Sequence, residues 1–267
     1  MDAPIGVFDS GIGGLTVLAA LMAALPHERF LYLGDTARLP YGTKSAHTVA
    51  RYALQAAEAL VNRGIKGLVV ACNTAASVGL EAVRGRLGSL PVIGVIEPGA
   101  QAACAASASG HIAVIATEAT VREGAYRRAI LQRRAQARVA QLPTQLLVAL
   151  AEEGLVDGPV AASVVGHYLR PLFAHDPPDT LVLGCTHFPA LTATIRAEVG
   201  AAINLVDSAL TTAAAVREQL LATGLARTAG AQSLQFMATD GPERFARVGS
   251  RFLGRTIEAQ RIELIDL

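Results

Sequence analysis

The segment 67-GLVVACNTA-75 places Cys72 and two polar side chains directly after a short apolar run. The segment 180-TLVLGCTHFP-189 repeats this pattern more than one hundred residues later, with Cys185 followed by a threonine and a histidine. Consecutive apolar residues are typical of parallel strands that are covered on both faces. We therefore expect each cysteine at the carboxyl end of a buried parallel strand, the edge at which α/β sheets bind ligands.

Other β-rich apolar runs alternate with longer Ala-rich segments along the chain. The predicted strands are residues 4–8, 30–34, 67–71, 91–96, 111–116, 180–184, 202–207, 233–238 and 261–265. Residues 45–64 have helical spacing of apolar side chains, with Ser45 as the N-cap and Gly64 as the end signal. This alternation predicts an α/β architecture with mainly parallel sheets.

Short strand-and-loop units recur along the sequence. The unit 4-PIGVFDSG-11 pairs with 67-GLVVACNT-74, and 111-HIAVIATEAT-120 pairs with 180-TLVLGCTH-187. Two similar halves of this kind fit two facing α/β domains, with a ligand site between the carboxyl ends of their strands. The length of 267 residues allows two domains of ordinary size or one large domain.

Composition narrows the class of protein. Hydrophobic residues make up 52% of the chain and charged residues 17%, which supplies a core and argues against disorder. A formal net charge of +1, without any long Lys/Arg run, argues against a nucleic-acid surface. The start lacks the pattern of a secretory signal, and the longest uncharged stretches are too rich in Ser and Gly for a membrane span. With three cysteines, we expect free thiols in a reducing cytoplasm.

The cysteines are the first candidates for chemistry. A thiol at the rim of a sheet, before a helix N-terminus, is expected to have a pKa below its usual value of about 8.5. Free cysteines are most often small buried hydrophobes, and we accept that interpretation for Cys104 in its Ala-rich segment. The polar residues after Cys72 and Cys185 favour function, as proton donor and acceptor on opposite sides of a cleft. Zinc binding through these thiols and His187, and a redox disulfide, are weaker alternatives because CxxC and HExxH spacings are missing.

The loop 9-DSGIGGLT-16 imitates a dinucleotide fingerprint, with Asp35 as the distal acidic residue. The imitation fails because Thr16 replaces the third glycine and Asp9 would repel a pyrophosphate. Asp9 fits better as a partner for an ammonium group, a thiol or a base.

A turn at Pro40, Tyr41 and Gly42 can present backbone N–H groups to a carboxylate. A site that combines thiols, carboxylates, one imidazole and neutral donors is best suited to binding a small zwitterion.

These motifs resemble those of the glutamate racemases, within the cofactor-independent aspartate/glutamate racemase superfamily. The resemblance rests on IGVFDSGIGGLTVL, LGDTARLPYG, ACNTAA, VIGVIEPG, ATEATV, LAEEG, VLGCTHFP, TDGPERF and FLG, in this order. It implies two pseudo-symmetric α/β domains with the active site in the cleft between them. The implied first domain combines residues 1–97 with 208–267, and the second spans residues 98–207.

The resemblance also implies roles for individual residues. Cys72 and Cys185 would be the catalytic acid/base pair, with Cys72 facing the proton of the D-enantiomer and Cys185 that of the L-enantiomer. Supporting catalytic groups would be Asp9, Asp35, Glu152 and His187, although Glu153 is an alternative to Glu152. The substrate site would be lined by Asp9, Ser10, Tyr41, Gly42, Asn73, Thr74, Thr117, Thr120, Thr186 and His187.

The expected activity is therefore the interconversion of L- and D-glutamate, which supplies D-glutamate for peptidoglycan. No cofactor is expected. Pyridoxal phosphate would need a lysine for its Schiff base, and neither lysine of the chain, Lys44 or Lys66, lies at the carboxyl end of a strand that faces the inferred cleft. The expected partner is glutamate alone, without nucleic acid, membrane or metal, and a homodimer is compatible with the resemblance. Alternative functions are a racemase of aspartate or another amino acid, a non-catalytic amino-acid sensor and, last, a dinucleotide oxidoreductase.

Overall fold

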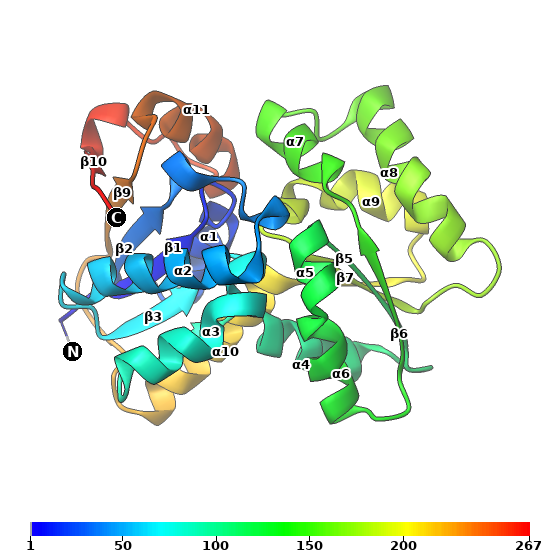
Figure 1. The fold of residues 1–267 in the computed structure, drawn as a ribbon, viewed down its shortest axis with the longest axis horizontal. Coiled ribbons are helices and arrows are strands. Elements are labelled where there is room, and N and C mark those ends of the chain that lie inside the picture. Colours follow the sequence, from blue (N-terminus) through cyan, green and yellow to red (C-terminus); the bar gives the residue numbers. More distant parts are fainter. Residues whose placement is uncertain (1) are drawn as a thin grey trace.

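The structure is a computed structural model that describes residues 2–267, and its strands form two separate parallel sheets (Figure 1). The larger sheet has six strands in the order β10-β9-β2-β1-β3-β4. Its strands are β1 (Ile5–Asp9), β2 (Arg29–Gly34), β3 (Gly67–Val70), β4 (Val92–Gly94), β9 (Ser233–Ala238) and β10 (Ile262–Leu264). The smaller sheet has the order β6-β5-β7-β8. Its strands are β5 (His111–Ala116), β6 (Arg138–Pro143), β7 (Thr180–Gly184) and β8 (Asn204–Asp207).

Helices follow most strands, as the alternation in the sequence predicts. The α-helices are α1 (Leu15–Ala24), α2 (Ala46–Val61), α3 (Asn73–Leu87), α4 (Ile96–Ala106), α5 (Glu118–Glu123), α6 (Ala125–Arg133), α7 (Leu146–Glu153), α8 (Gly158–Phe173), α9 (Thr192–Val199), α10 (Ser208–Ala222) and α11 (Pro242–Leu253). The 3-10 turns are η1 (Thr36–Arg38), η2 (Tyr41–Thr43), η3 (Phe188–Leu191) and η4 (Ala259–Arg261). The α/β architecture with parallel sheets is therefore confirmed.

The chain passes from one sheet to the other and back. It builds β1 to β4, then β5 to β8, and returns through α10 to add β9, β10 and α11 to the larger sheet (Figure 1). Helix α10 packs against both α1 and α4, close to the place where the chain crosses. The strand membership of the sheets supports the division at residues 97/98 and 207/208, which stays a prediction.

Most predicted strands agree with the structure to within a few residues, but β6 was not predicted. Its sequence, RVAQLP, mixes polar and apolar residues because the strand lies at the edge of the smaller sheet and is only partly buried. Helix α2 begins where Ser45 accepts a hydrogen bond from the backbone N–H of Thr48. It ends at Val61, slightly before Gly64, whose φ of 73° belongs to the following turn.

The central strands determine where the polar loops lie. In the larger sheet β1 pairs with both β2 and β3, and in the smaller sheet β5 pairs with both β6 and β7. All five residues of β1, and all five of β7, are buried. The loops after β1, β3, β5 and β7 therefore emerge from the middle of each sheet, at its carboxyl edge. Among residues 2–267, no helix has the length and apolarity needed to cross a membrane.

Candidate active site

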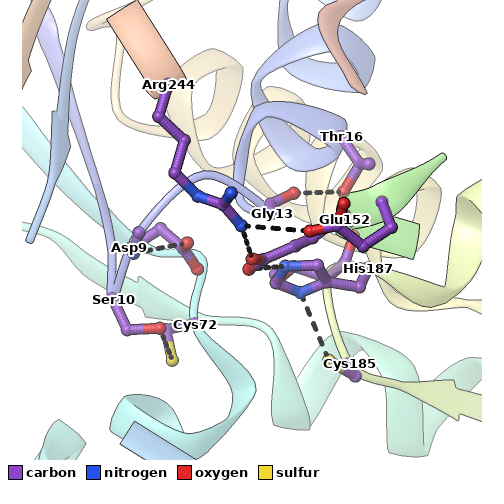
Figure 2. Close-up of polar contacts among 12 residues, drawn as sticks. Asp9, Ser10, Gly13, Thr16, Cys72, Glu152, Cys185, His187 and Arg244 are labelled. Carbon is purple, nitrogen blue, oxygen red and sulfur yellow. Dashed lines mark hydrogen bonds and ion pairs between the residues drawn. The ribbon is translucent and has the colours of Figure 1, made fainter. Parts of the chain in front are cut away.

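A cavity lies between the two sheets, and its lining comes from the carboxyl ends of both. The larger sheet contributes Ser10, Gly11, Ile12, Leu39, Pro40, Tyr41, Gly42, Cys72, Asn73 and Thr74. The smaller sheet contributes Thr117, Gln145, Val148, Glu152, Cys185, Thr186 and His187. The two cysteines of the repeated pattern thus line one cavity from opposite sheets, as Figure 2 shows.

Cys72 lies at the N-cap of α3, next to the neutral hydroxyl of Ser10. Its Sγ accepts the backbone N–H of Ala75 at 3.4 Å and donates to the hydroxyl of Ser10 at 3.3 Å. Burial raises the pKa of the Cys72 thiol to about 12, and the nearby carboxylate of Asp9 acts in the same direction. The expectation of a lowered thiol pKa is wrong for Cys72 in this structure, because burial outweighs the two backbone N–H groups.

Cys185 has a cationic neighbour instead. Its Sγ lies 3.7 Å from Nδ1 of His187, and Nε2 of the same ring lies 3.1 Å from Oε1 of Glu152. Burial alone would lower the pKa of His187, but the hydrogen bonds and charges of Cys185 and Glu152 raise it to about 10. Burial would raise the pKa of Glu152, yet His187 and Arg244 together hold it below its usual value. An imidazolium beside Cys185 stabilises negative charge on that sulfur.

Asp9 is the last residue of β1. Its Oδ2 accepts the backbone N–H of Gly11 at 2.9 Å, and its Oδ1 is buried without a hydrogen-bond partner among the described residues. Burial raises the pKa of Asp9, while the positive charge of His187 and the backbone N–H groups lower it. Asp9 therefore contributes negative potential to both sides of the cavity without being one of its lining residues.

The glycines after Asp9 allow two parts of the chain to approach each other. A Cβ on Gly13 would overlap the ring of His187, and one on Gly14 would overlap the side chain of Asp9. Neither glycine has a positive φ, so the reason for glycine is space and not backbone conformation. The DSGIGG motif thus brings the β1–α1 loop against the Cys185 loop.

Neutral donors and acceptors complete the site. The hydroxyls of Thr74, Thr117 and Thr120 form a buried cluster, with Thr74 2.9 Å from Thr117. Thr74 and Thr117 of this cluster line the cavity, whereas Thr120 does not. Nδ2 of Asn73 and Oε1 of Gln145 are buried without a hydrogen-bond partner among the described residues. Because a buried unpaired polar atom is costly, these two amides are natural partners for a bound polar ligand.

The structure places Asp35 differently from the expectation. Its carboxylate is fully buried and is bound by Arg38 at 2.7 Å, by Thr239 at 3.0 Å and by the hydroxyl of Tyr41. Asp35 does not line the cavity, whereas Tyr41 and Gly42 do. Its position supports a structural role, holding the turn at Tyr41 against the β9–α11 connection.

The lysines lie away from the cavity. Lys66 directly precedes β3, at the amino edge of the sheet, where it pairs with the buried carboxylate of Glu28 at 2.6 Å. Lys44 is partly buried after η2 and is not a lining residue. Within residues 2–267, no group of three or more His, Cys, Asp or Glu side chains has an arrangement that could hold a metal ion.

The model of the Asp/Glu/Hydantoin racemase family matches residues 15–217. The chain belongs to this family. A glutamate racemase of Geobacter metallireducens is 50% identical over 251 residues, covering 94% of this chain and 92% of the relative. A glutamate racemase of Neisseria meningitidis is 46% identical over 265 residues, covering 99% of this chain and 97% of the relative.

Solved structures of racemases have the same fold. A glutamate racemase of Francisella tularensis in complex with D-glutamate matches with a TM-score of 0.92 and 35% identity, covering 99% of this chain and 98% of that one. A glutamate racemase of Thermus thermophilus in complex with β-chloro-D-alanine matches with a TM-score of 0.89 and 43% identity, covering 100% of this chain and 98% of that one. The resemblance inferred from the motifs is confirmed.

Several residues of this racemase-family site were not singled out in the sequence. Gln145 and Val148 line the cavity from the start of α7, which follows the unpredicted strand β6. Arg244 on α11 reaches Glu152 from the larger sheet. Glu152 faces His187 while Glu153 points outward with a 61% exposed side chain, so the geometry favours Glu152 of the two glutamates.

Proposed function

We propose that the protein is a glutamate racemase that works without a cofactor, with Cys72 and Cys185 as its two acid/base groups. The observation that carries this proposal is the pair of thiols on opposite sides of one cavity, each after a central strand of a different sheet. The high identity to glutamate racemases over nearly the whole chain supports glutamate as the substrate.

The reaction needs one base and one acid on opposite faces of the α-carbon. In the L-to-D direction the Cys185 thiolate removes the α-proton, and the Cys72 thiol donates its proton to the other face. In the reverse direction Cys72 is the base and Cys185 is the acid, so each turnover moves one proton onto one sulfur and one proton off the other.

The surroundings of the thiols support this assignment for the L-to-D direction. Cys72 is protonated at neutral pH because its pKa is raised to about 12. The imidazolium of His187 stabilises a thiolate on Cys185. The Cys72 side therefore holds the acid, and the positive charge of His187 lies beside the sulfur that is proposed to remove the proton of L-glutamate.

Substrate binding is assigned to the neutral donors of the cavity. The backbone of the Tyr41–Gly42 turn and the hydroxyls of Ser10, Thr74 and Thr117 can bind the two carboxylates. Asn73 and Gln145 offer the buried amides that lack protein partners. In the cell, we place this activity in the cytoplasm, as a supply of D-glutamate for peptidoglycan by a protein that works alone or as a homodimer.

An assay without added cofactor tests the function. Purified protein should convert L-glutamate and D-glutamate to the same racemic mixture in D₂O, with deuterium entering the α-position, and a carbonyl-trapping reagent should not inhibit it. Parallel incubations with the enantiomers of aspartate and alanine test selectivity. Activity that requires pyridoxal phosphate, or faster turnover of aspartate than of glutamate, would overturn the proposal. Binding of glutamate without any exchange would instead support a sensor.

A further inference from the structure

The Glu152 carboxylate is held from two sides. Its Oε1 lies 3.1 Å from Nε2 of His187, and its Oε2 accepts a hydrogen bond from the Arg244 guanidinium at 2.8 Å. Figure 2 shows Arg244 extending from its helix to the carboxylate, with His187 between Glu152 and Cys185. Each oxygen of Glu152 thus has a different partner, which fixes the orientation of the carboxylate.

The two residues of this ion pair belong to different sheets. Arg244 is on α11, which packs against α1 and follows β9 of the larger sheet. Glu152 is on α7, which follows β6 of the smaller sheet. The ion pair therefore spans the cleft and forms only when the two sheets are held together.

Other contacts from the larger sheet restrict the same histidine. Phe252, also on α11, packs edge-to-face on the His187 ring with centroids 5.3 Å apart. The hydroxyl of Thr16 donates to the carbonyl of Thr186 at 2.8 Å, and Gly13 lies directly against the ring. These contacts restrict rotation of the His187 ring, and the contact between Nε2 and Glu152 adds to them in keeping Nδ1 toward Cys185.

Arg244 does not line the cavity, and its side chain is 44% exposed. It therefore does not contact a substrate held between the two thiols. Solvent screens the partly exposed guanidinium, so the ion pair contributes little to folding. The consequence of the pair lies in the position of Glu152 and not in the stability of the chain.

We propose that Arg244 is a positioning residue for the Cys185 side of the site, acting across the cleft through Glu152 and His187. Arg244 holds the Glu152 carboxylate in the orientation in which Oε1 faces Nε2 of His187, and Glu152 in turn holds the imidazolium with Nδ1 toward Cys185. Cys72 instead contacts the hydroxyl of Ser10 and the backbone N–H of Ala75, and neither contact involves Arg244. This inference rests on the proposed two-thiol function.

The test compares Arg244→Gln and Arg244→Lys with Arg247→Gln as a matched control. Arg247 is exposed on the same helix and makes no hydrogen bond or ion pair among the described residues. The substrates are the two enantiomers of a glutamate analogue that carries chloride on its β-carbon. Removal of the α-proton by one thiolate expels chloride from this analogue, so each enantiomer reports on one thiol.

Arg244→Gln should slow elimination from the L-analogue about ten-fold, less than the ~10²–10⁴-fold expected for the loss of an acid/base group itself. Elimination from the D-analogue should change less than about two-fold. Arg244→Lys should restore most of the L-activity, because it keeps the charge, and Arg247→Gln should match the parent protein. The thermal unfolding midpoints of all variants should agree within about 2 °C.

A second readout does not need catalysis. The carboxyl carbon of Glu152, labelled with ¹³C and assigned with Glu152→Gln, should titrate at higher pH in Arg244→Gln and remain unchanged in Arg247→Gln, because a nearby cation favours the carboxylate. An unchanged titration, or equal losses for both enantiomers, would overturn the inference. If the parent protein proved unable to racemise glutamate, the titration would still test the ion pair by itself.

Discussion

Sγ of Cys185 lies 3.7 Å from Nδ1 of His187, a ring whose pKa is raised to about 10. The corresponding neighbour of Cys72 is the hydroxyl of Ser10, which carries no charge. Two thiols that follow similar strands therefore have unlike electrostatic surroundings. The chemistry that this difference allows can be tested one thiol at a time.

Cys72→Ser and Cys185→Ser should each lower racemisation by at least about 10²-fold, because a hydroxyl is a much poorer base than a thiolate. Both variants should remain folded, since serine is close to cysteine in size and both positions border a polar cavity. With the β-chloro analogue, Cys72→Ser should still process the L-enantiomer through Cys185, and Cys185→Ser should still process the D-enantiomer through Cys72. Equal residual elimination from both enantiomers in both variants would favour a single base.

Thiol alkylation should abolish activity, and glutamate should protect by covering the cavity. Cys104→Ala should leave the inactivation and the protection unchanged. Cys104 lies on α4, outside the cavity, and its Sγ contacts the carbonyl of Ile130 at 3.7 Å. Mass spectrometry of the modified peptides identifies the site, and a loss of activity that followed modification of Cys104 alone would contradict the assignment.

Asp9→Asn should make Cys72 more reactive. Burial is the main reason for the raised pKa of Cys72, and the Asp9 carboxylate adds to it. Removing this charge lowers the pKa of the thiol, so more thiolate is present at any pH below it, and alkylation of Cys72 at pH 8 should accelerate about three- to ten-fold. The comparison is made in the Cys104→Ala background. Asp157→Asn is the control, because Asp157 is exposed and is not one of the residues that line the cavity. An unchanged rate in Asp9→Asn would mean that burial alone sets the pKa of Cys72.

Gln145→Leu should raise KM for glutamate about ten-fold and change kcat less. The amide of Gln145 lines the cavity, and its buried Oε1 has no hydrogen-bond partner among the described residues. A hydrogen bond to a charged ligand contributes about 1.5–3 kcal/mol, enough for this change in KM. Gln141→Leu is the control, because Gln141 bonds the carbonyl of Val121 outside the cavity. Equal KM values for the two variants would remove Gln145 from the binding site.

The sequence predicts the parts of this fold that depend on local pattern. Buried central strands such as β1, β5 and β7 are continuous apolar runs, and each was predicted. Strand β6 was missed because one side of it has no neighbouring strand, so its residues need not be apolar. Because β6 was not predicted, the sequence also provided no reason to place Gln145 at the site, although Gln145 lies only two residues after the end of that strand.

The site depends on contacts that no local pattern contains. Cys72 and Cys185 could be paired because they end similar units, but Arg244 meets Glu152 across 92 positions of the sequence. Asp35 looked like a site residue because it follows a strand, and its carboxylate is instead bound by Arg38, Tyr41 and Thr239. A carboxylate is available for a ligand only if no protein group already binds it, and one of the groups that bind Asp35 is Thr239, which lies 204 positions further along the chain.

The unlike neighbours of the two thiols have a kinetic consequence. L- and D-glutamate have equal free energies in water, so no enzyme can shift their equilibrium, and kcat/KM must be the same in both directions. The imidazolium beside Cys185 and the neutral hydroxyl beside Cys72 can therefore make kcat and KM differ between the two directions, but not their ratio. In the proposed two-thiol mechanism, the L-enantiomer reacts with a thiolate on Cys185, which lies beside the ring of His187. The D-enantiomer needs a thiolate on Cys72, which is scarce because the pKa of that thiol is raised to about 12. We therefore expect D-glutamate to have the higher KM and, in equal proportion, the higher kcat.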